Sequence, residues 1–443
     1  MKSLAAKAFR SLTVEIDPLL VNFSSLSSLR RDPTFFWEEP DADWLLVGFG
    51  AAWNHQSAPG PERIVSAAEA GAEIFDQIVH LQNSDVPGPL LVGGFSFSDR
   101  KKTSSNSDAM TWSEFPSGLL VLPEITLQRR GTRAWISAVI PTSVSARSAE
   151  EIVREVIACL DDGSREFWMS SKDSQVTSNR DDLFQRLVKY AVTEVESGKL
   201  AKVVAARSAL VETTADPWRV LDVLRRRYPS CAVYGVFRRS SVFVGASPEL
   251  LVGLQSGKVT SHALAGTVDR GIDALADAEL EDQLRYDPKE LAEHQYVVQG
   301  LRRALHESGV TLDSPSQIEI VKLANVQHLS SSVSGHVPNS TGVLDLVDAV
   351  HPTPAVAGLP RTAALEWLAE NERLDRGWYA GPIGWMDSAL DGSFRVALRC
   401  ALLEDGRARL FAGAGIVAGS RPDRELAETS AKLGAMFGAL SAS

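Results

Sequence analysis

Two short segments of the chain, KELAEH and PDRELAET, each contain two glutamates spaced three residues apart. The pairs are Glu290 with Glu293 and Glu425 with Glu428. Both segments are typical of helices, so the two carboxylates of a pair share one helix face and repel each other by about 0.2–0.5 kcal/mol. If the two acidic faces meet, they need a cation between them, and a few hard oxygen ligands suit Mg²⁺. The sequence therefore suggests a magnesium site, provided that the four carboxylates converge.

A lysine and a glutamate elsewhere in the chain have the setting of a general base and a general acid. Lys202 opens the apolar segment KVVAAR, where partial burial would favour the neutral amine that a base requires. Glu249 lies in VFVGASPELLVG, and a carboxyl group among apolar residues can stay protonated and donate a proton. Position alone also allows a strand-edge lysine and an exposed turn glutamate, because both residue types are rarely buried.

Two further positions allow more than one interpretation. Gly266 and Thr267 follow an apolar run in SHALAGTVDRG, where backbone N–H groups of a turn can bind a carboxylate, although a plain hairpin turn fits equally well. Asp287 and Pro288 predict the start of the KELAEH helix, so Glu290 has an alternative role in completing a capping box.

The C-terminal segment LFAGAGIVAGSRPDRELAETSAK predicts a strand, a glycine-rich turn and a helix capped by Ser420. Gly413, Gly415 and Gly419 resemble a dinucleotide-binding fingerprint. Their spacing differs from G-x-G-x-x-G and no strand follows, so nucleotide binding is disfavoured. Lys432 stands one helical turn after the second glutamate pair, which predicts an i,i+4 salt bridge.

The elements that must position these residues are mostly strands in the first part of the chain. Strands are predicted at WLLVGFGAAW, PLLVGGFSFS, SGLLVLPEITLQRR and RAWISAVI, which are apolar and bounded by glycine and proline. Helices are predicted at PERIVSAAEAGAEIFDQIV and at SAEEIVREVIACLDD, which opens with a Ser-x-x-Glu capping box. The stretch KKTSSNSDAMTW is predicted to be an exposed loop.

A polar spacer, DGSREFWMSSKDSQVTSNRD, precedes the second part of the chain. A helix at LFQRLVKYAVTEVESGKL is followed by predicted strands at KVVAARSALVE, CAVYGVF, SSVFVGAS, ELLVGLQ, KVTSHAL, FRVALRCALLED and RARLFAGAGIVA. Strands in adjacent runs, rather than in strict alternation with helices, favour an α+β fold with large antiparallel sheets flanked by helices. We expect an N-terminal β-rich part (1–175) and a catalytic region (176–443) of the same fold.

Composition narrows the class of protein. The 443 residues are 44% hydrophobic and 23% charged, which is ordinary for a globular protein. A net charge of −11 argues against binding to nucleic acid or to an anionic membrane. The three cysteines show no CxxC spacing, and no apolar run approaches a membrane span. We therefore expect a cytoplasmic protein without disulfides or a zinc site.

The motifs of the second part together resemble one enzyme family. KVVAAR, GASPELL, ALAGT, DPKELAEHQYVV, NVQHL, HPTPAVAGLP, YAGPIGW, RVALRCA and AGAGIVAGSRPDRELAETSAK occur in the order seen in chorismate-utilising enzymes. This resemblance runs from about residue 183 to the C-terminus. The N-terminal phrases FFWEEPD, GFGAAW and GGFSFS look like those of isochorismate synthases within that family. The resemblance implies a single chorismate-binding domain with the fold of anthranilate synthase.

The resemblance also implies roles for individual residues. Lys202 matches the base that activates water, and Glu249 matches the acid beside the departing hydroxyl group. Glu293 and Glu428 match ligands of a Mg²⁺ ion that bridges the protein and a substrate carboxylate, with Glu290 and Glu425 completing the acidic cluster. The positions that match substrate-binding residues are Gly266, Thr267, His328, Tyr379, Arg399, Gly413 and Lys432.

Within the family, the residues favour isochorismate synthase, which converts chorismate reversibly to isochorismate. Ammonia-using relatives (anthranilate and aminodeoxychorismate synthases) commonly lack a lysine at the position of Lys202, and the latter often have lysine where this chain has Ala265. Salicylate synthases share nearly all of these residues and then eliminate pyruvate, so they stay an alternative. An ammonia-dependent anthranilate or aminodeoxychorismate synthase subunit and a non-catalytic chorismate binder are further alternatives. We expect a monomer without an obligate glutaminase subunit. Menaquinone and siderophore pathways both begin with isochorismate, and these residues do not choose between them.

Overall fold

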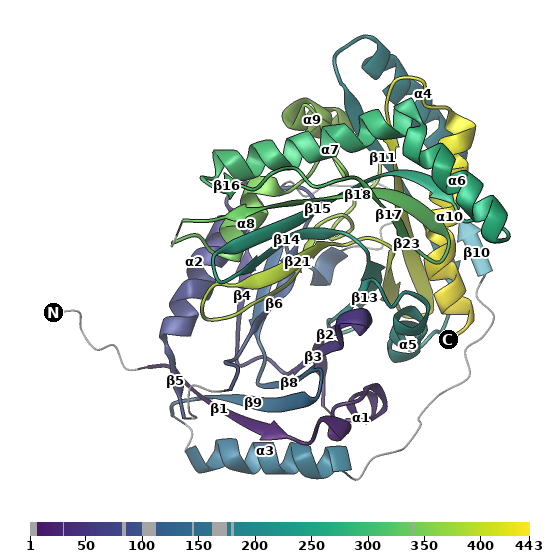
Figure 1. Cartoon of the computed structure of the whole chain (residues 1–443). Coiled ribbons are helices and arrows are strands. Elements are labelled where there is room, and N and C mark those ends of the chain that lie inside the picture. Colours follow the sequence, from purple (N-terminus) through teal and green to yellow (C-terminus); the bar gives the residue numbers. More distant parts are fainter. Residues whose placement is uncertain are drawn as a thin grey trace.

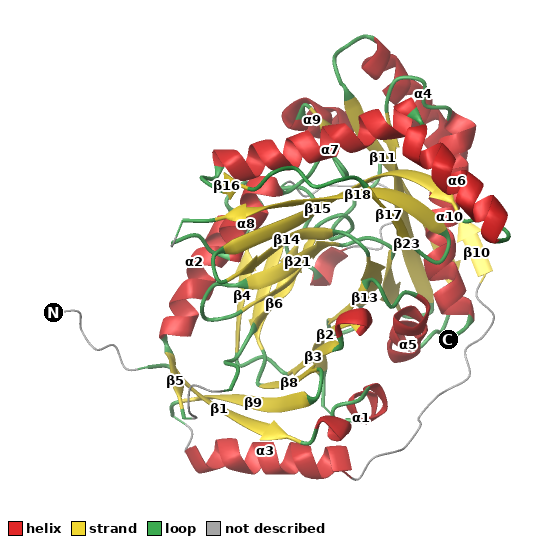
Figure 2. Cartoon of the chain, in the orientation of Figure 1, coloured by secondary structure: helices red, strands yellow, loops and turns green. Residues whose placement is uncertain are grey.

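The computed structural model describes residues 7–29, 31–81, 86–99, 112–143, 146–161, 175–178, 181–338 and 340–443. In this part of the chain, two large sheets lie against each other and helices cover their outer faces (Figures 1 and 2). Within the described ranges, every strand pair is antiparallel except the one between β1 and β5. The α+β class with large antiparallel sheets, expected from the sequence, is confirmed.

The first sheet has 13 strands among the described residues. Its order is β10 (Gln175–Ser178), β11 (Lys202–Glu212), β23 (Arg407–Ile416), β22 (Cys400–Glu404), β13 (Val242–Ser247), β12 (Ala232–Phe237), β2 (Pro33–Glu39), β3 (Trp44–Phe49), β8 (Ile125–Arg130), β9 (Arg133–Pro141), β1 (Phe9–Ile16) and β5 (Ile78–His80), with β19 (Gly358–Leu359) also paired to β11.

The second sheet has 10 strands in the same described part. Its order is β16 (Thr311–Leu312), β18 (Val326–His336), β15 (Lys258–Asp269), β14 (Leu250–Gln255), β21 (Gly392–Val396), β20 (Pro382–Met386), β6 (Leu91–Phe95), β7 (Gly118–Leu122) and β4 (Trp53–Ser57), with β17 (Glu319–Lys322) paired to β18. Both sheets combine strands from the first and second parts of the chain, since β2 pairs with β12 and β6 pairs with β20.

The helices divide between the two sheets. They are α1 (Phe23–Ser28), α2 (Arg63–Asp76), α3 (Ala146–Asp161), α4 (Asp181–Glu196), α5 (Pro217–Arg227), α6 (Ala274–Tyr286), α7 (Pro288–Glu307), α8 (Val343–Val350), α9 (Arg361–Asn371) and α10 (Pro422–Ser441). Helices α3, α5 and α10 pack on the first sheet, whereas α2, α7 and α8 pack on the second (Figure 1). None of the described helices is long and apolar enough to span a membrane.

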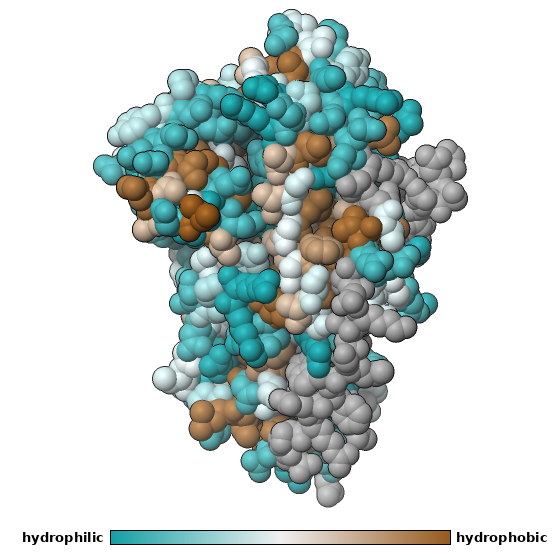
Figure 3. All heavy atoms as spheres, turned by 90° about the vertical axis from the view of Figure 1, so that its right-hand side faces the viewer, coloured by the Kyte–Doolittle hydropathy of each residue, from teal (hydrophilic) through white to brown (hydrophobic). Residues whose placement is uncertain are grey.

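Strand β2 shows why the first sheet needs cover on both faces. Phe35 and Trp37 belong to the hydrophobic cluster between the sheets, and Phe36 belongs to the cluster beneath the outer helices. Successive strand residues point to opposite faces, so a run of aromatic residues serves two cores at once. On the face shown in Figure 3, hydrophobic residues form small separate groups among hydrophilic ones.

Three apolar runs that the sequence predicts as single strands each form two strands in different sheets. The run 44–53 divides into β3 and β4 around Gly50, whose φ is +65°. The run 117–130 divides into β7 and β8 around Pro123, and the run 394–405 divides into β21 and β22 before Cys400. The hydrophobic pattern does not reveal the breaks in the runs 117–130 and 394–405, because the strands on both sides of each break are largely buried.

Two predicted helix starts are wrong by one or two residues. Ser148 lies inside α3, which begins at Ala146, so it is not an N-cap. The N-cap of α10 is Arg421 rather than Ser420, whose hydroxyl instead accepts a hydrogen bond from the N–H of Val417 at 3.2 Å. The predicted loop KKTSSNSDAMTW, except for its last residue, and most of the predicted polar spacer lie outside the described residues.

Candidate active site

The candidate site lies where two chain segments pass side by side from one sheet to the other. Glu249 stands between β13 of the first sheet and β14 of the second, and Arg399 stands between β21 and β22. Hydrogen bonds join the two crossings, from the Ala246 N–H to the Arg399 carbonyl and from the Val396 N–H to the Glu249 carbonyl, both at 3.1 Å. The crossings therefore place a carboxyl and a guanidinium group in the same junction.

Arg399 has an unusual backbone conformation at this junction. Its φ is +47°, in the left-handed region that costs a non-glycine residue about 1–3 kcal/mol. The surrounding sheets hold it there, and the guanidinium group is buried with its Nη2 3.1 Å from Nε2 of His328. Backbone strain at a buried charged residue is typical of functional sites.

A cavity opens at the junction and contains about 680 Å³ of space, part of it open to solvent. The lining contains most of the residues that the sequence singled out: Glu249, Gly266, Thr267, Glu293, His328, Tyr379, Arg399, Gly413, Glu428 and Lys432. Lys202, Glu290 and Glu425 are not part of the lining and lie behind it. The structure thus brings all the predicted site residues into one region.

Glu249 is buried, with 3% of its surface exposed, so the alternative of an exposed turn glutamate is wrong. Burial raises the pKa of Glu249 to about 8, although the positive charges of Lys202, Arg399 and Lys432 act to lower it. Its carboxyl group is therefore mostly protonated at neutral pH. This is the state that a general acid needs.

Lys202 is completely buried, which rules out the alternative of a strand-edge lysine. Its Nζ lies 2.8 Å from Oε1 of Glu293, and this ion pair holds the pKa of Glu293 below its usual value against the opposing effect of burial. The contact engages one of the three donors of the ammonium group, and no further partner of Nζ lies among the described residues. A Cβ at Gly415 would lie 2.8 Å from Cε of Lys202, so the glycine makes room for the pair.

Lys289 forms ion pairs with Glu290 and Glu425, which lie behind the cavity lining. Its Nζ lies 3.2 Å from Oε1 of Glu425 and 3.4 Å from Oε1 of Glu290. Oε2 of Glu290 accepts a hydrogen bond from the N–H of Thr267 at 2.9 Å, and the N–H of Asp287 donates to another residue. The capping-box alternative for Glu290 is therefore wrong, although Asp287 is the N-cap of α7 as predicted.

Glu428 and Lys432 form the predicted i,i+4 salt bridge on α10. The Nζ of Lys432 also donates to the carbonyl of Gly413 at 2.9 Å. Gly413 lies within β23 rather than in a loop, and a Cβ there would come 2.9 Å from the Tyr379 hydroxyl. The ring of Tyr379 stacks on Phe411 with centroids 5.3 Å apart, so this wall of the cavity is tightly packed.

Gly266 and Thr267 form a bulge within β15, not the hairpin turn that the sequence also allowed. The register slips between Ala265 and Thr267, and Gly266 adopts a φ of +80°. The bulge directs the Thr267 hydroxyl to Nδ1 of His328 at 3.0 Å. Burial and the nearby Arg399 charge lower the pKa of His328 well below its usual value, so this histidine is neutral.

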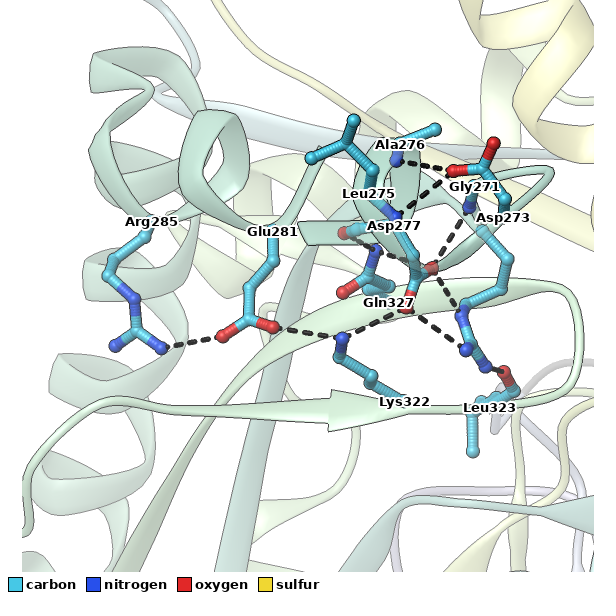
Figure 4. A network of polar contacts seen from close by, with 11 residues as sticks. Gly271, Asp273, Leu275, Ala276, Asp277, Glu281, Arg285, Lys322, Leu323 and Gln327 are labelled. Carbon is cyan, nitrogen blue, oxygen red and sulfur yellow. Dashed lines mark hydrogen bonds and ion pairs between the residues drawn. The ribbon is translucent and has the colours of Figure 1, made fainter. Parts of the chain in front are cut away.

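A charge network fixes α6 to the second sheet next to this bulge (Figure 4). Asp277 accepts hydrogen bonds from Nε of Arg270 at 2.7 Å, from Nζ of Lys322 at 2.9 Å and from Nε2 of Gln327 at 3.1 Å. The hydrogen bond from Arg270, with that from Lys322, holds the pKa of Asp277 well below its usual range. The network fixes the segment that connects β15 through α6 to α7.

The four predicted metal ligands form one electrostatic unit. Burial raises the pKa of Glu290, with repulsion from Glu293 adding to it, and burial and Glu428 raise the pKa of Glu425 to about 7. In the described chain, no group of three or more His, Cys, Asp and Glu side chains has an arrangement that could hold a metal ion as it stands. The carboxylates are instead paired with the ammonium groups of three lysines. Buried oxygen donors that repel one another and take cations as partners fit Mg²⁺ by their chemistry.

Sequence reasoning missed residues that support the site. Lys289 stands inside the KELAEH motif, and a lysine beside the two glutamates of that motif was a usable signal. Gly415 belongs to a glycine pattern considered only for nucleotide binding. Arg376 lines the cavity, and its ion-pair partner Glu372 is buried behind it; neither belongs to a motif that predicts this position.

The chain is similar to known proteins over most of its length. A family model described as "Chorismate binding enzyme" matches residues 2–441. The chain is 36% identical over 441 residues to the "Salicylate biosynthesis isochorismate synthase" of Pseudomonas aeruginosa, covering 97% of this chain and 89% of that protein. It is 32% identical over 423 residues to the isochorismate synthase MenF of Bacillus subtilis, covering 92% and 87%.

Two solved structures have similar folds. The menaquinone-specific isochorismate synthase MenF of Escherichia coli has a TM-score of 0.78 at 26% identity, covering 99% of this chain and 96% of that one. Anthranilate synthase component I of Streptococcus pneumoniae has a TM-score of 0.73 at 22% identity, covering 90% and 93%, and this likeness concerns the fold alone.

Proposed function

Because the chain belongs to the family of chorismate-binding enzymes, we propose that it is an isochorismate synthase that uses Lys202 as base and Glu249 as acid. The observation that carries this proposal is the burial of Glu249, which raises its pKa, in the same site as the buried Lys202. An acid and a base held together in a buried site are what the exchange of one hydroxyl group for another requires.

The proposed reaction moves a hydroxyl group around the ring of chorismate. Lys202 takes a proton from water as the water oxygen bonds to ring carbon C2. The ring double bonds shift, the C4–O bond breaks, and Glu249 gives its proton to the departing hydroxyl group, which leaves as water. One water enters and one leaves, so chorismate and isochorismate are isomers. The reverse reaction uses the same groups with their proton states exchanged.

The ion pair with Glu293 affects the role of Lys202. An ionised Glu293 pairs with the ammonium form of Lys202, and this form cannot accept a proton. Lys202 has to lose a proton before it acts as base. Gly415 and Glu293 both line the cavity, and Lys202 lies against both of them, so its amine is within reach of a water there.

Charge complementarity supports a dianionic substrate in an acidic protein. Arg399 and Lys432 line the cavity and supply positive charge for the carboxylates of chorismate. A Mg²⁺ ion held by Glu293 and Glu428, with Glu290 and Glu425 behind them, would supply further positive charge for a substrate carboxylate. Neutral His328 and Tyr379 would donate or accept hydrogen bonds without adding charge.

The names of the relatives support isochorismate as the product. One relative is named for salicylate biosynthesis and another for menaquinone, and both are called isochorismate synthase. We therefore propose that this chain forms isochorismate and leaves the later steps to other enzymes.

The test is to incubate the purified protein with chorismate and Mg²⁺ and to separate the products by chromatography. We expect isochorismate in equilibrium with chorismate, no pyruvate, and no effect of ammonium. Salicylate fluorescence together with pyruvate, in the absence of any added lyase, would show a salicylate synthase instead. Anthranilate or aminodeoxychorismate formed with ammonium would show an ammonia-dependent synthase.

A further inference from the structure

Among the described residues, strand β11, which begins at Lys202, has no continuous strand neighbour along one edge. Its other edge pairs with β23 from Val203 to Glu212. On the open edge, β19 pairs with residues 202–203, the N–H of Val204 donates to the carbonyl of Ala357 at 2.9 Å, and β10 pairs with residues 210–212, which leaves a gap beginning at the carbonyl of Val204. Buried backbone groups in such a gap need other partners, because an unpaired one costs about 1–3 kcal/mol.

Two side chains fill this gap. Nη2 of Arg376 donates a hydrogen bond to the carbonyl of Val204 at 2.7 Å. Oε2 of Glu372 accepts one from the N–H of Ala206 at 2.8 Å. Arg376 and Glu372 also bind each other, with Nε to Oε1 at 2.6 Å and Nη2 to Oε2 at 2.8 Å. The ion pair thus takes the place of a missing strand beside the base.

The same arginine holds two other segments of the cavity wall. Nη1 of Arg376 donates to the carbonyl of Val356 at 2.8 Å, and its own carbonyl accepts from the N–H of Tyr379 at 2.9 Å. Its guanidinium carbon lies 4.2 Å from the ring centroid of Phe97. Val204, Val356 and Tyr379 all line the cavity, so one buried group connects three parts of its wall.

The hydrogen bonds of Arg376 distinguish it from a substrate-binding arginine. A guanidinium group has five N–H donors. Arg376 gives both Nη2 donors, the Nε donor and one Nη1 donor to the protein, which leaves one. Arg399 keeps its Nε without a partner and gives Nη2 to a neutral histidine. Of these two arginines, Arg399 is the one that has donors for a two-point contact with a carboxylate.

We propose that Glu372 and Arg376 form a positioning pair that fixes Lys202 and Tyr379 relative to each other for the proposed reaction. The pair acts through β11 and through the turn that ends at Tyr379. It does not form a two-point contact with a carboxylate of the substrate. Because this inference rests on the proposed isochorismate synthase activity, its test includes a measurement that needs no turnover.

The experiment compares Glu372→Gln with Glu38→Gln in the full chain. Glu38, which is buried, also forms a two-point ion pair, with the partly exposed Arg225, between β2 and α5. Both changes keep side-chain shape and remove the charge of a buried glutamate that is paired with an arginine, so both are expected to lower thermal stability. Glu372→Gln should lower kcat for chorismate by about tenfold to a hundredfold with little change in KM, because small displacements of a catalytic group have effects of this size. Glu38→Gln should leave kcat unchanged.

Hydrogen–deuterium exchange of the peptide covering residues 202–207 supplies the measurement without turnover. It should be faster in Glu372→Gln and unchanged in Glu38→Gln. Should Glu372→Gln fail to fold, Arg376→Lys keeps the charge but not the fork of hydrogen bonds and should show the same pattern. A kcat equal to that of the wild type, unchanged exchange, or a rise in KM alone would overturn the proposal. If the wild-type protein does not turn over chorismate, the proposed function is refuted. The exchange comparison would still show whether Glu372 and Arg376 hold β11 in place.

Discussion

A methyl group built on Gly415 would come within 2.2 Å of Oε1 of Glu293, closer than any real contact. Gly415 faces Val204 across the β11–β23 pair, and the Lys202–Glu293 ion pair occupies the space where its side chain would be. Gly415 and Glu293 therefore depend on each other: the glutamate fits only because the glycine has no side chain. A side chain at position 415 should displace the ion pair and lower the rate of catalysis.

Gly415→Ala should push Glu293 and Lys202 apart and lower kcat by about a hundredfold, as expected for a misplaced catalytic group. Gly434→Ala is the matched control, since it lies on α10 and its added Cβ would meet nothing within 4 Å. In a helix interior that change should be neutral or stabilise by about 0.5–1 kcal/mol. Steady-state kinetics and thermal unfolding of both variants check this, and equal kcat values would contradict it.

Lys202→Ala should remove turnover while leaving chorismate binding in the presence of Mg²⁺ largely intact. Loss of a general base typically costs about 10²–10⁴ in rate. Lys199→Ala, which changes an exposed lysine three residues earlier in the chain, should be fully active. Product formation and calorimetric binding measure the two effects separately. A Lys202→Ala protein with normal activity would refute the role of this residue as base.

Glu428→Ala should raise the Mg²⁺ concentration needed for half-maximal activity by tenfold or more, which corresponds to about 1.4 kcal/mol of metal binding. Asp423→Ala removes a carboxylate from the first turn of the same helix, where it forms an exposed pair with Arg421, and should leave the titration unchanged. Calorimetric titration with Mg²⁺ alone, without substrate, gives an independent reading. An unaltered Mg²⁺ titration in Glu428→Ala would show that this glutamate does not contribute to a metal site.

The pH dependence of the rate should report Glu249. Its pKa, raised by burial to about 8, keeps the carboxyl group protonated below that pH. Because the acid has to carry its proton, kcat/KM in the forward direction should fall as the pH rises through about 8. Glu249→Gln should be inactive at every pH, and a forward rate that stays constant from pH 7 to pH 9 would contradict the assignment.

Glu249 should also make protein stability depend on pH. Its pKa is higher in the folded protein than the 4.5 of an ordinary glutamate, so the folded state binds the proton more tightly. This stabilisation is complete below about pH 4.5 and is lost as the pH rises toward 8. Urea unfolding at pH 6 and pH 8 should show a larger decline for the wild type than for Glu249→Gln. Equal declines would indicate that the carboxyl group is ionised at both pH values.

The sequence predicted most individual elements because their hydrophobic patterns are strong. Strand β11 has the predicted bounds, Lys202 to Glu212, and Asp287 is the N-cap of α7 as expected. The points where a strand changes sheet could not be predicted, since apolar residues continue through the break before Cys400. The motifs supplied the site residues, but their burial and partners depend on contacts between segments far apart in the chain. Lys289 shows this, because its bond to Glu425 joins two helices that no local pattern connects.

The interleaving of the two sheets has a consequence for how the protein is made. Strand β2 leaves the ribosome long before its partner β12, and β6 leaves long before β20. Exposed apolar edges of this kind favour aggregation and are protected by chaperones during synthesis. The site needs α10 for Glu428 and Lys432, so its lining is complete only once α10 has packed against the sheets. Many contacts between distant segments also make folding slow, and we expect the site to form late in folding.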